Sequence, residues 1–179
     1  MTPGPTPVPE DIRNEMAKPI IHHRTKAYQA IFKDVTEGLK KIFKTDNDLF
    51  TFTSSGTGAM EASIVNVLSP GDKIIVVRGG KFGERFGDIA KAYGVEVIAV
   101  DVEWGAAPSP ESVKEALKSN PDVKAVYTTL CETSTATVYD IKTIGEVVRN
   151  TNALYVVDAI SGIGADDFEN DAWGVDIAI

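Results

Sequence analysis

The stretch Leu49-Phe-Thr-Phe-Thr-Ser-Ser-Gly-Thr-Gly-Ala-Met-Glu-Ala-Ser-Ile-Val-Asn-Val-Leu68 changes its periodicity halfway along. Residues 49–53 alternate apolar side chains with Thr, which predicts a short strand, and residues 59–68 carry apolar side chains at helical spacing. Between them lies a loop of Ser, Thr and Gly. Such a loop at a helix start presents free N–H groups and hydroxyls at the positive end of the helix dipole, so we interpret it as a phosphate site. The same residue types also cap helices and form turns with no ligand at all.

Strand and helix patterns alternate along the rest of the chain. After a short helix at 10–18 and an amphipathic helix at 26–43, we expect strands at 73–78, 95–100, 124–130 and 153–157, separated by helices at 82–93, 110–118 and 141–150. This alternation predicts an α/β fold of three layers, in which a mainly parallel sheet is flanked by helices. In such sheets ligands bind at the carboxyl ends of the strands.

Three polar features fall at predicted strand ends: the loop at 55–57, a Thr- and Ser-rich loop at 132–137, and Asp158. We expect them to converge on one site. Asp158 follows a run of apolar residues, so its carboxylate should lie at the edge of a buried layer, where it needs a cationic or N–H partner. The alternative is that Asp158 only caps the turn at Ser161-Gly162.

Composition excludes several classes of function. The chain has 179 residues and a net charge of −8, which argues against a nucleic-acid or anionic-membrane surface. Its one cysteine, Cys131, allows no disulfide framework and suggests a reducing compartment, so we expect a cytoplasmic location. No apolar run reaches the roughly 20 residues of a membrane span. The neighbouring His22 and His23 cannot share one helix face as paired ligands, and we predict no metal site.

The predicted site combines a phosphate loop, an aromatic residue at Phe82 and a carboxylate at Asp158. Together they describe a pocket for a flat, phosphorylated and protonated heteroaromatic ring, and pyridoxal 5'-phosphate fits all three. Phe82 would cover one face of the ring, and Asp158 would keep the ring nitrogen protonated, which makes the ring a stronger electron sink.

At this point the sequence resembles a known family, the class V pyridoxal-phosphate-dependent aminotransferases, and most closely their alanine/serine–glyoxylate (serine–pyruvate) branch. This resemblance implies the large domain of the fold type I transferases, pyridoxal phosphate as cofactor and a homodimer. Several blocks in the right order carry it: Thr2-Pro-Gly-Pro-Thr-Pro-Val8, His23-Arg24, Ser55-Gly-Thr-Gly-Ala-Met-Glu-Ala62, Asn66-Val-Leu-Ser-Pro-Gly-Asp72, Phe82-Gly-Glu-Arg85, Glu132-Thr-Ser-Thr135, Val157-Asp158-Ala159 and Trp173-Gly-Val-Asp-Ile177.

The resemblance also implies roles for single residues. Phe82 replaces an aromatic that is often Trp in relatives, and the pairs Leu130-Cys131 and Ala136-Thr137 depart from the usual pattern around the polar loop. The implied roles are phosphate binding for Ser55, Gly56 and Thr57, ring stacking for Phe82, a hydroxyl contact to the cofactor for Thr133, the pyridine-nitrogen contact for Asp158, and lining of the substrate site for Gly4 and Pro5.

The lysine that forms the Schiff base in this family follows the Gly-Val-Asp-Ile segment, so we expect it beyond Ile179, together with the C-terminal small domain. The last residues, 174–179, read as the opening of a buried strand that looks cut. We therefore expect an extended arm and short helix at 1–18, an incomplete large domain at 19–179, and no activity for this piece by itself.

The expected reaction of the full-length protein is transamination between alanine or serine and glyoxylate or pyruvate. Near alternatives of the same fold type are a cysteine desulfurase and a phosphoserine aminotransferase. More distant ones are a nucleotide-binding domain with Gly56-Thr57-Gly58 as fingerprint, which Glu61 and Arg78 disfavour, and a non-enzymatic partner subunit of another enzyme.

Overall fold

The computed structural model describes residues 4–179, which divide into two compact units, one ending at Leu39 and the other spanning Lys40–Ile179. The first unit contains helix α1 (Glu10–Met16) and most of helix α2 (Lys26–Phe43), and neither helix has a buried residue. Glu10 and Asp11 occupy the first turn of α1, where negative charge opposes the helix dipole. Residues 1–3 of the predicted arm lie outside the described residues.

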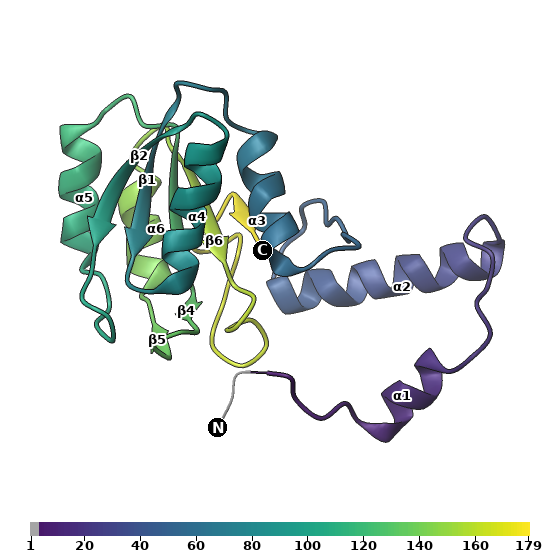
Figure 1. Cartoon of the computed structure of the whole chain (residues 1–179). Helices are drawn as coiled ribbons and strands as arrows, with labels where there is room; N and C mark the ends of the chain where they lie inside the picture. Colours follow the sequence, from purple (N-terminus) through teal and green to yellow (C-terminus); the bar gives the residue numbers. More distant parts are fainter. Residues whose placement is uncertain (1–3) are drawn as a thin grey trace. The chain divides into compact units, whose positions relative to one another are not determined.

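The second unit is built on a five-stranded parallel sheet in the order β2-β1-β3-β6-β7. Helices α3, α4, α5 and α6 flank it, which confirms the predicted three-layer α/β architecture (Figure 1). The bounds of these elements are β1 Lys73–Arg78, β2 Glu96–Asp101, β3 Ala125–Thr129, β6 Leu154–Asp158, β7 Ile177–Ala178, α3 Gly56–Val65, α4 Lys81–Ala92, α5 Pro110–Ser119 and α6 Ile141–Val148.

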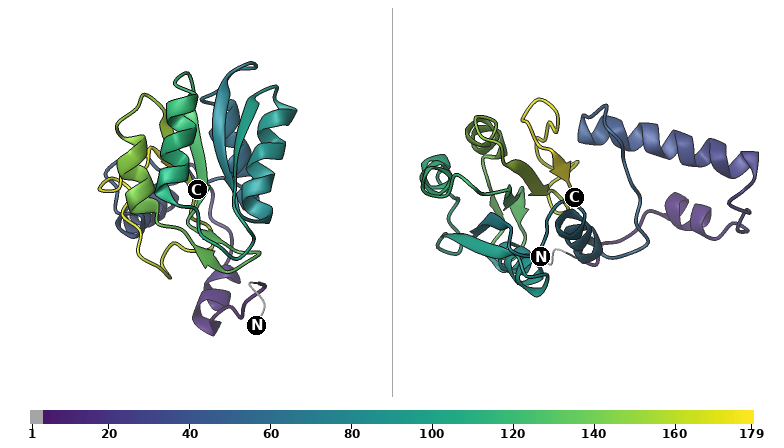
Figure 2. Two further views of the ribbon diagram at one scale, coloured as in Figure 1. Left: turned by 90° about the vertical axis from the view of Figure 1, so that its left-hand side faces the viewer. Right: turned by 90° about the horizontal axis from the view of Figure 1, so that it is seen from above.

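Alternate residues of the central strands face two separate hydrophobic layers. Ile74 and Val76 of β1 pack in the layer that includes Met60 of α3 and Phe86 of α4, whereas Ile75 and Val77 pack in the layer of α5 and α6. The two views in Figure 2 show these helix pairs on opposite sides of the sheet. Because both faces of β1 are covered, its sequence is a continuous apolar run and does not alternate.

Two sequence predictions were wrong in detail. Residues 49–53 form no strand, and Phe50 and Phe52 are 76% and 53% exposed. Alternation predicts a strand only where a partner strand can take up its N–H and C=O groups, and this segment has none. The predicted loop at 132–137 is instead flanked by two short antiparallel strands, β4 (Cys131–Glu132) and β5 (Thr137–Val138).

The remaining helices and strands begin and end within a few residues of their predicted bounds. Helix α5 begins as predicted, because Ser109 accepts a hydrogen bond from the Ser112 N–H at 3.1 Å and Pro110 occupies the first helical position. The strand expected at 174–179 is limited to β7. In the part of the chain that the structure describes, no helix combines the length and apolarity needed to cross a membrane.

Candidate functional site

The carboxyl ends of β3 and β6 bring two of the predicted features together. Thr129 and Asp158 are register partners at the ends of these neighbouring strands, and the N–H of Leu130 donates to the carbonyl oxygen of Asp158 at 2.7 Å. Beyond this pair, the Thr133 hydroxyl contacts the hydroxyl of Ser161 in the turn that follows β6. The β4–β5 hairpin and Asp158 therefore lie at one edge of the sheet, as the parallel topology predicts.

Asp158 is a nearly buried carboxylate, with 5% of its surface exposed. Burial is the main cause that raises its pKa to about 6, and the negative charge of Glu132 adds to the shift, while a hydrogen bond from the Ile160 N–H and the charge of Arg85 oppose it. The Ile160 N–H donates to Oδ1 at 3.0 Å. Asp158 thus bonds the backbone at Ile160, one residue before the Ser161-Gly162 turn, and its contact with a ring nitrogen stays a prediction.

The first turn of α3 carries the predicted phosphate loop. Ser55 stands at the N-cap, and its side chain makes no capping hydrogen bond. A Cβ atom on Gly56 would lie 2.2 Å from Cδ1 of Ile160, so the start of this helix lies against the residue two positions after Asp158. The phosphate loop and the buried carboxylate therefore adjoin each other.

The N-terminus of α4 is occupied in a different way. Its N-cap, Gly80, has no side chain, and the carboxylate of Glu132 accepts hydrogen bonds from the N–H groups of Phe82 and Gly83, each at 3.1 Å. Ser134 Oγ accepts from the Lys81 N–H at 3.0 Å. Since these donors are already bonded, α4 offers less to an added anion than α3 does. This difference favours α3 as the phosphate-binding helix.

Arg85 joins the phosphate loop to the predicted stacking residue. Its Nη1 donates to Oγ1 of Thr57 at 3.0 Å, and its guanidinium carbon lies 4.9 Å from the centroid of the Phe82 ring. Sequence reasoning quoted Arg85 only as part of a motif and gave it no role. The available signal was its spacing, because residues 82 and 85 share one helix face.

Glu132 was also quoted without a role, although it is fully buried. Its chemistry was visible in the sequence as a carboxylate two residues after the apolar strand at 124–130, where burial demands hydrogen-bond partners. Its partners on α4, Phe82 and Gly83, lie 50 and 49 residues earlier in the chain.

Gly4 and Pro5 belong to the unit that ends at Leu39, where both are exposed. Their expected place in the substrate site stays a prediction.

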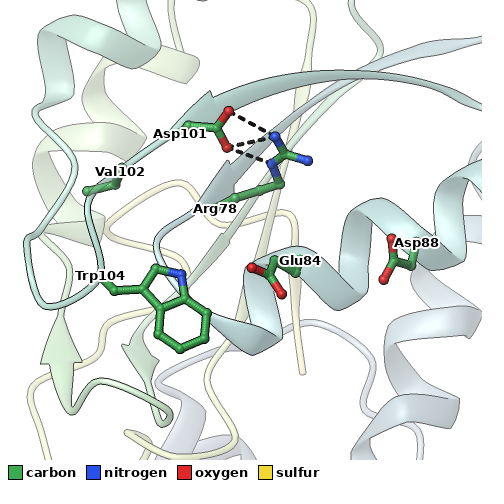
Figure 3. Close-up of a pocket in the computed structure, with 6 residues that line it drawn as sticks. All are labelled: Arg78, Glu84, Asp88, Asp101, Val102 and Trp104. Carbon is green, nitrogen blue, oxygen red and sulfur yellow. Dashed lines mark hydrogen bonds and ion pairs between the residues drawn. The ribbon is translucent and has the colours of Figure 1, made fainter.

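A separate pocket of about 340 Å³ lies beside β1, β2 and α4, and none of the predicted site residues lines it (Figure 3). Two of its charges are already paired with each other, because the Arg78 guanidinium donates to both oxygens of Asp101 at 2.8 and 2.9 Å. A third, Glu84, accepts from Lys81 Nζ at 2.6 Å. These internal pairs leave Asp88 as the other charged residue of the lining, so the sheet edge at Asp158 is the stronger candidate site.

The residues at that edge fit pyridoxal phosphate by their chemistry. Hydroxyls, free N–H groups and the cation of Arg85 surround the start of α3 and suit a phosphate dianion. Phe82 offers an aromatic face, and the buried carboxylate of Asp158 suits a protonated ring nitrogen.

Comparison with known proteins agrees with this chemistry. The chain is 49% identical over 179 residues to an uncharacterized aminotransferase of Methanocaldococcus jannaschii and 41% identical over 180 residues to the soluble hydrogenase 42 kDa subunit of Anabaena cylindrica. These matches cover 100% and 99% of this chain, but only 46% and 47% of the relatives. The chain thus spans about half the length of the curated relatives that it matches.

A solved structure with the same fold is the ureidoglycine-glyoxylate aminotransferase of Bacillus subtilis, which superposes with a TM-score of 0.95 at 31% identity over 99% of this chain and 46% of the other. The family model for class V aminotransferases matches residues 10–179, nearly the whole chain. The chain therefore belongs to the class V aminotransferase family.

Proposed function

We propose that the full-length protein is a pyridoxal-phosphate-dependent aminotransferase that exchanges an amino group between a small amino acid, alanine or serine, and a small 2-oxo acid, glyoxylate or pyruvate. The observation that carries this proposal is the buried carboxylate of Asp158 beside a helix start with free donors. Family membership supports the reaction class, and the glyoxylate named for the Bacillus subtilis protein supports the acceptor.

Each residue of the proposed site has a separate task. Ser55, Gly56 and Thr57 bind the phosphate, and the ring of Phe82 packs against the cofactor and keeps water from that face. With its pKa near 6, Asp158 is mostly ionised at neutral pH, and it holds the proton on the pyridine nitrogen. When bound, pyridoxal phosphate supplies the electron sink for amino transfer.

The proposal extends to the surroundings of the site. The homodimer, the cytoplasmic location and the lining of the substrate site by Gly4 and Pro5 are part of the same proposal and rest on the same resemblance and on the single cysteine.

The test is an assay of the purified full-length protein with alanine or serine as donor and glyoxylate or pyruvate as acceptor. We expect turnover with at least one pair, and Asp158→Asn should lower kcat by about two orders of magnitude or more, because the ring nitrogen loses the carboxylate that keeps it protonated. Asp140→Asn, which removes the charge of the N-cap of α6 but keeps an accepting oxygen, is the matched control, since the described side-chain hydrogen bonds of Asp140 go to Thr143. A native protein that binds no pyridoxal phosphate would overturn the proposal.

Two of the alternatives lack support from the geometry. Burial and the charges of Asp166 and Glu132 raise the pKa of the Cys131 thiol, which disfavours the thiolate that a desulfurase requires. The dinucleotide fingerprint requires a strand before Gly56, and residues 44–55 contain none. A phosphoserine aminotransferase differs only in its substrate, and the same assay with phosphoserine as donor separates it.

A role as partner subunit has one specific observation in its favour, the hydrogenase-subunit name of the Anabaena cylindrica relative. Its test is affinity purification of the full-length protein from its own cells. Recovery of stoichiometric hydrogenase chains together with a lack of transamination would favour this second function.

A further inference from the structure

We propose that Glu132 is a positioning residue of the cofactor pocket, which fixes the Phe82 side of the pocket to the Thr133 side. The inference rests on the proposed function, because it assigns a role toward pyridoxal phosphate. The described hydrogen bonds of Glu132 reach neither the phosphate loop nor Asp158. Glu132 instead acts through Phe82 and Thr133, which are expected to contact the cofactor.

The Glu132 carboxylate is saturated with hydrogen bonds. Its Oε2 accepts from the N–H groups of Phe82 and Gly83, each at 3.1 Å. Its Oε1 accepts from Ser134 Oγ at 2.7 Å, from the Ser134 N–H at 3.2 Å and, at 3.3 Å, from the Phe82 N–H. Glu132 has no exposed surface, so water cannot replace these donors without opening the structure.

These bonds hold Thr133 from both sides. Thr133 lies between Glu132 and Ser134, and both neighbours are bonded to the first turn of α4, since Ser134 Oγ also accepts from the Lys81 N–H at 3.0 Å. Close packing reinforces the joint, because a Cβ on Gly80 would lie 2.5 Å from Cδ of Glu132. The backbone that carries the Phe82 ring is thereby joined to the backbone that carries the Thr133 hydroxyl before any ligand arrives.

The charge of Glu132 adds to this geometry. In the described part of the chain, no Lys, Arg or His approaches its carboxylate as an ion pair, and the backbone dipoles of α4 are its main compensation. Its field contributes to the raised pKa of Asp158. A site with two buried carboxylates favours a cation, which is the form that a protonated pyridine ring takes.

A carboxylate in this place could also serve only as a distant cap of α4, which would stabilise the fold without affecting cofactor binding. The two roles separate when stability and affinity are measured together. Asp140→Asn provides the comparison, because it also turns a capping carboxylate into an amide, at α6, where the described side-chain hydrogen bonds go to Thr143.

Glu132→Gln is the informative substitution. Its side chain keeps the shape, but whichever way the amide turns, its NH2 group faces either the N–H groups of Phe82 and Gly83 or the N–H of Ser134. Ser134→Ala is the milder variant, because it removes one hydroxyl and leaves the carboxylate bonded to α4. Both variants keep every residue that we assign to direct cofactor contact.

The experiment uses the full-length protein and measures the dissociation constant of pyridoxal phosphate by absorbance titration, the thermal midpoint, and amide hydrogen exchange at Phe82 and Gly83 without cofactor. We expect Glu132→Gln to weaken binding by about 10- to 100-fold, as loss of a partner behind a ligand-contacting group does. Exchange at both amides should accelerate. Ser134→Ala should weaken binding by less than Glu132→Gln, and Asp140→Asn should leave affinity within about twofold, because distant sites act independently.

The inference is overturned if Glu132→Gln binds pyridoxal phosphate within about twofold of the native protein although both amides exchange faster, because loss of the joint would then not reach the pocket. It is also overturned if Asp140→Asn lowers the thermal midpoint as much as Glu132→Gln does and weakens pyridoxal phosphate binding to the same extent. A native protein that binds no pyridoxal phosphate would be a different failure, since it removes the proposed function itself.

Discussion

Arg85 Nη1 donates a hydrogen bond to Thr57 Oγ1 at 3.0 Å, and so links α4 to the first turn of α3 through a charged group. We expect Arg85→Gln to weaken the binding of both pyridoxal phosphate and inorganic phosphate about fivefold, equivalent to roughly 1 kcal/mol for a partly solvated charge. Arg85→Lys should recover part of the loss. Lys81→Gln is the control, because Lys81 is an exposed cation of the same helix whose Nζ bonds Glu84. Equal losses in both Gln variants would assign the effect to net charge alone.

The raised pKa of Asp158 predicts a pH-dependent stability in the cofactor-free protein. The folded state holds this proton up to a pKa of about 6, whereas the ordinary value is 3.8, so between these values the folded state binds more protons than the unfolded state and stability falls as pH rises. Above pH 6 the penalty is fully present. Its size is at most roughly 3 kcal/mol by the usual conversion of a pKa difference.

Asp158→Asn should therefore gain stability relative to the native protein between pH 4 and pH 7. The measurement is the free energy of urea unfolding of both proteins at pH 4 and at pH 7, without cofactor. Because the other titrating groups are common to both proteins, their effect cancels in the difference between the two free energies. A constant difference across this range would show that Asp158 titrates in the folded protein as it does in water.

Two glycines that each allow a close approach should respond differently to alanine. A Cβ on Gly83 would lie 2.4 Å from the carbonyl oxygen of Val77, which belongs to the backbone of β1 and cannot turn away. The Cβ of Gly56→Ala meets Cδ1 and Cγ1 of Ile160, at 2.2 and 3.4 Å, and this side chain is 48% exposed and can rotate. We expect Gly83→Ala to cost about 2–3 kcal/mol and Gly56→Ala less than about 1 kcal/mol in urea unfolding. Equal costs would contradict this distinction.

Cys131 should react slowly with alkylating agents. Burial, with the charges of Asp166 and Glu132, raises the pKa of its thiol, so less thiolate is present at pH 8 than in a free cysteine. We expect iodoacetamide to modify the native protein several-fold more slowly than it modifies the urea-unfolded protein at this pH. The readout is the rate of mass increase, and comparable rates would mean that the thiol is neither shielded nor shifted.

The parallel sheet could be predicted because its strands are covered on both faces. A run such as Ile74–Val77 can be buried only between two layers, and the alternation of such runs with amphipathic helices leaves few other topologies. Asp158 followed from the same reasoning, as a polar residue at the end of a buried run.

The wrong strand at residues 49–53 and the missed roles of Glu132 and Arg85 have a common cause, because each depends on contacts between segments far apart in the sequence. Residues 49–53 have the alternation of a strand, but a strand needs a partner, and the pattern of one segment cannot state whether a partner exists. The partners of Glu132 and Arg85 lie 50 and 28 residues away in the chain, at distances that depend on how the elements pack. Hydrophobic periodicity describes one helix or strand at a time, so it could not predict the contacts between elements.

The cap that Glu132 provides for α4 also has a consequence for the order of events during synthesis. The ribosome adds the 50 residues between Phe82 and Glu132 in roughly 3–10 s at ordinary elongation rates. Throughout that interval the N–H groups of Lys81, Phe82 and Gly83 lack the partners that Ser134 and Glu132 later provide. The start of this helix therefore cannot take its final hydrogen bonds until the chain has been made through β3 and Glu132.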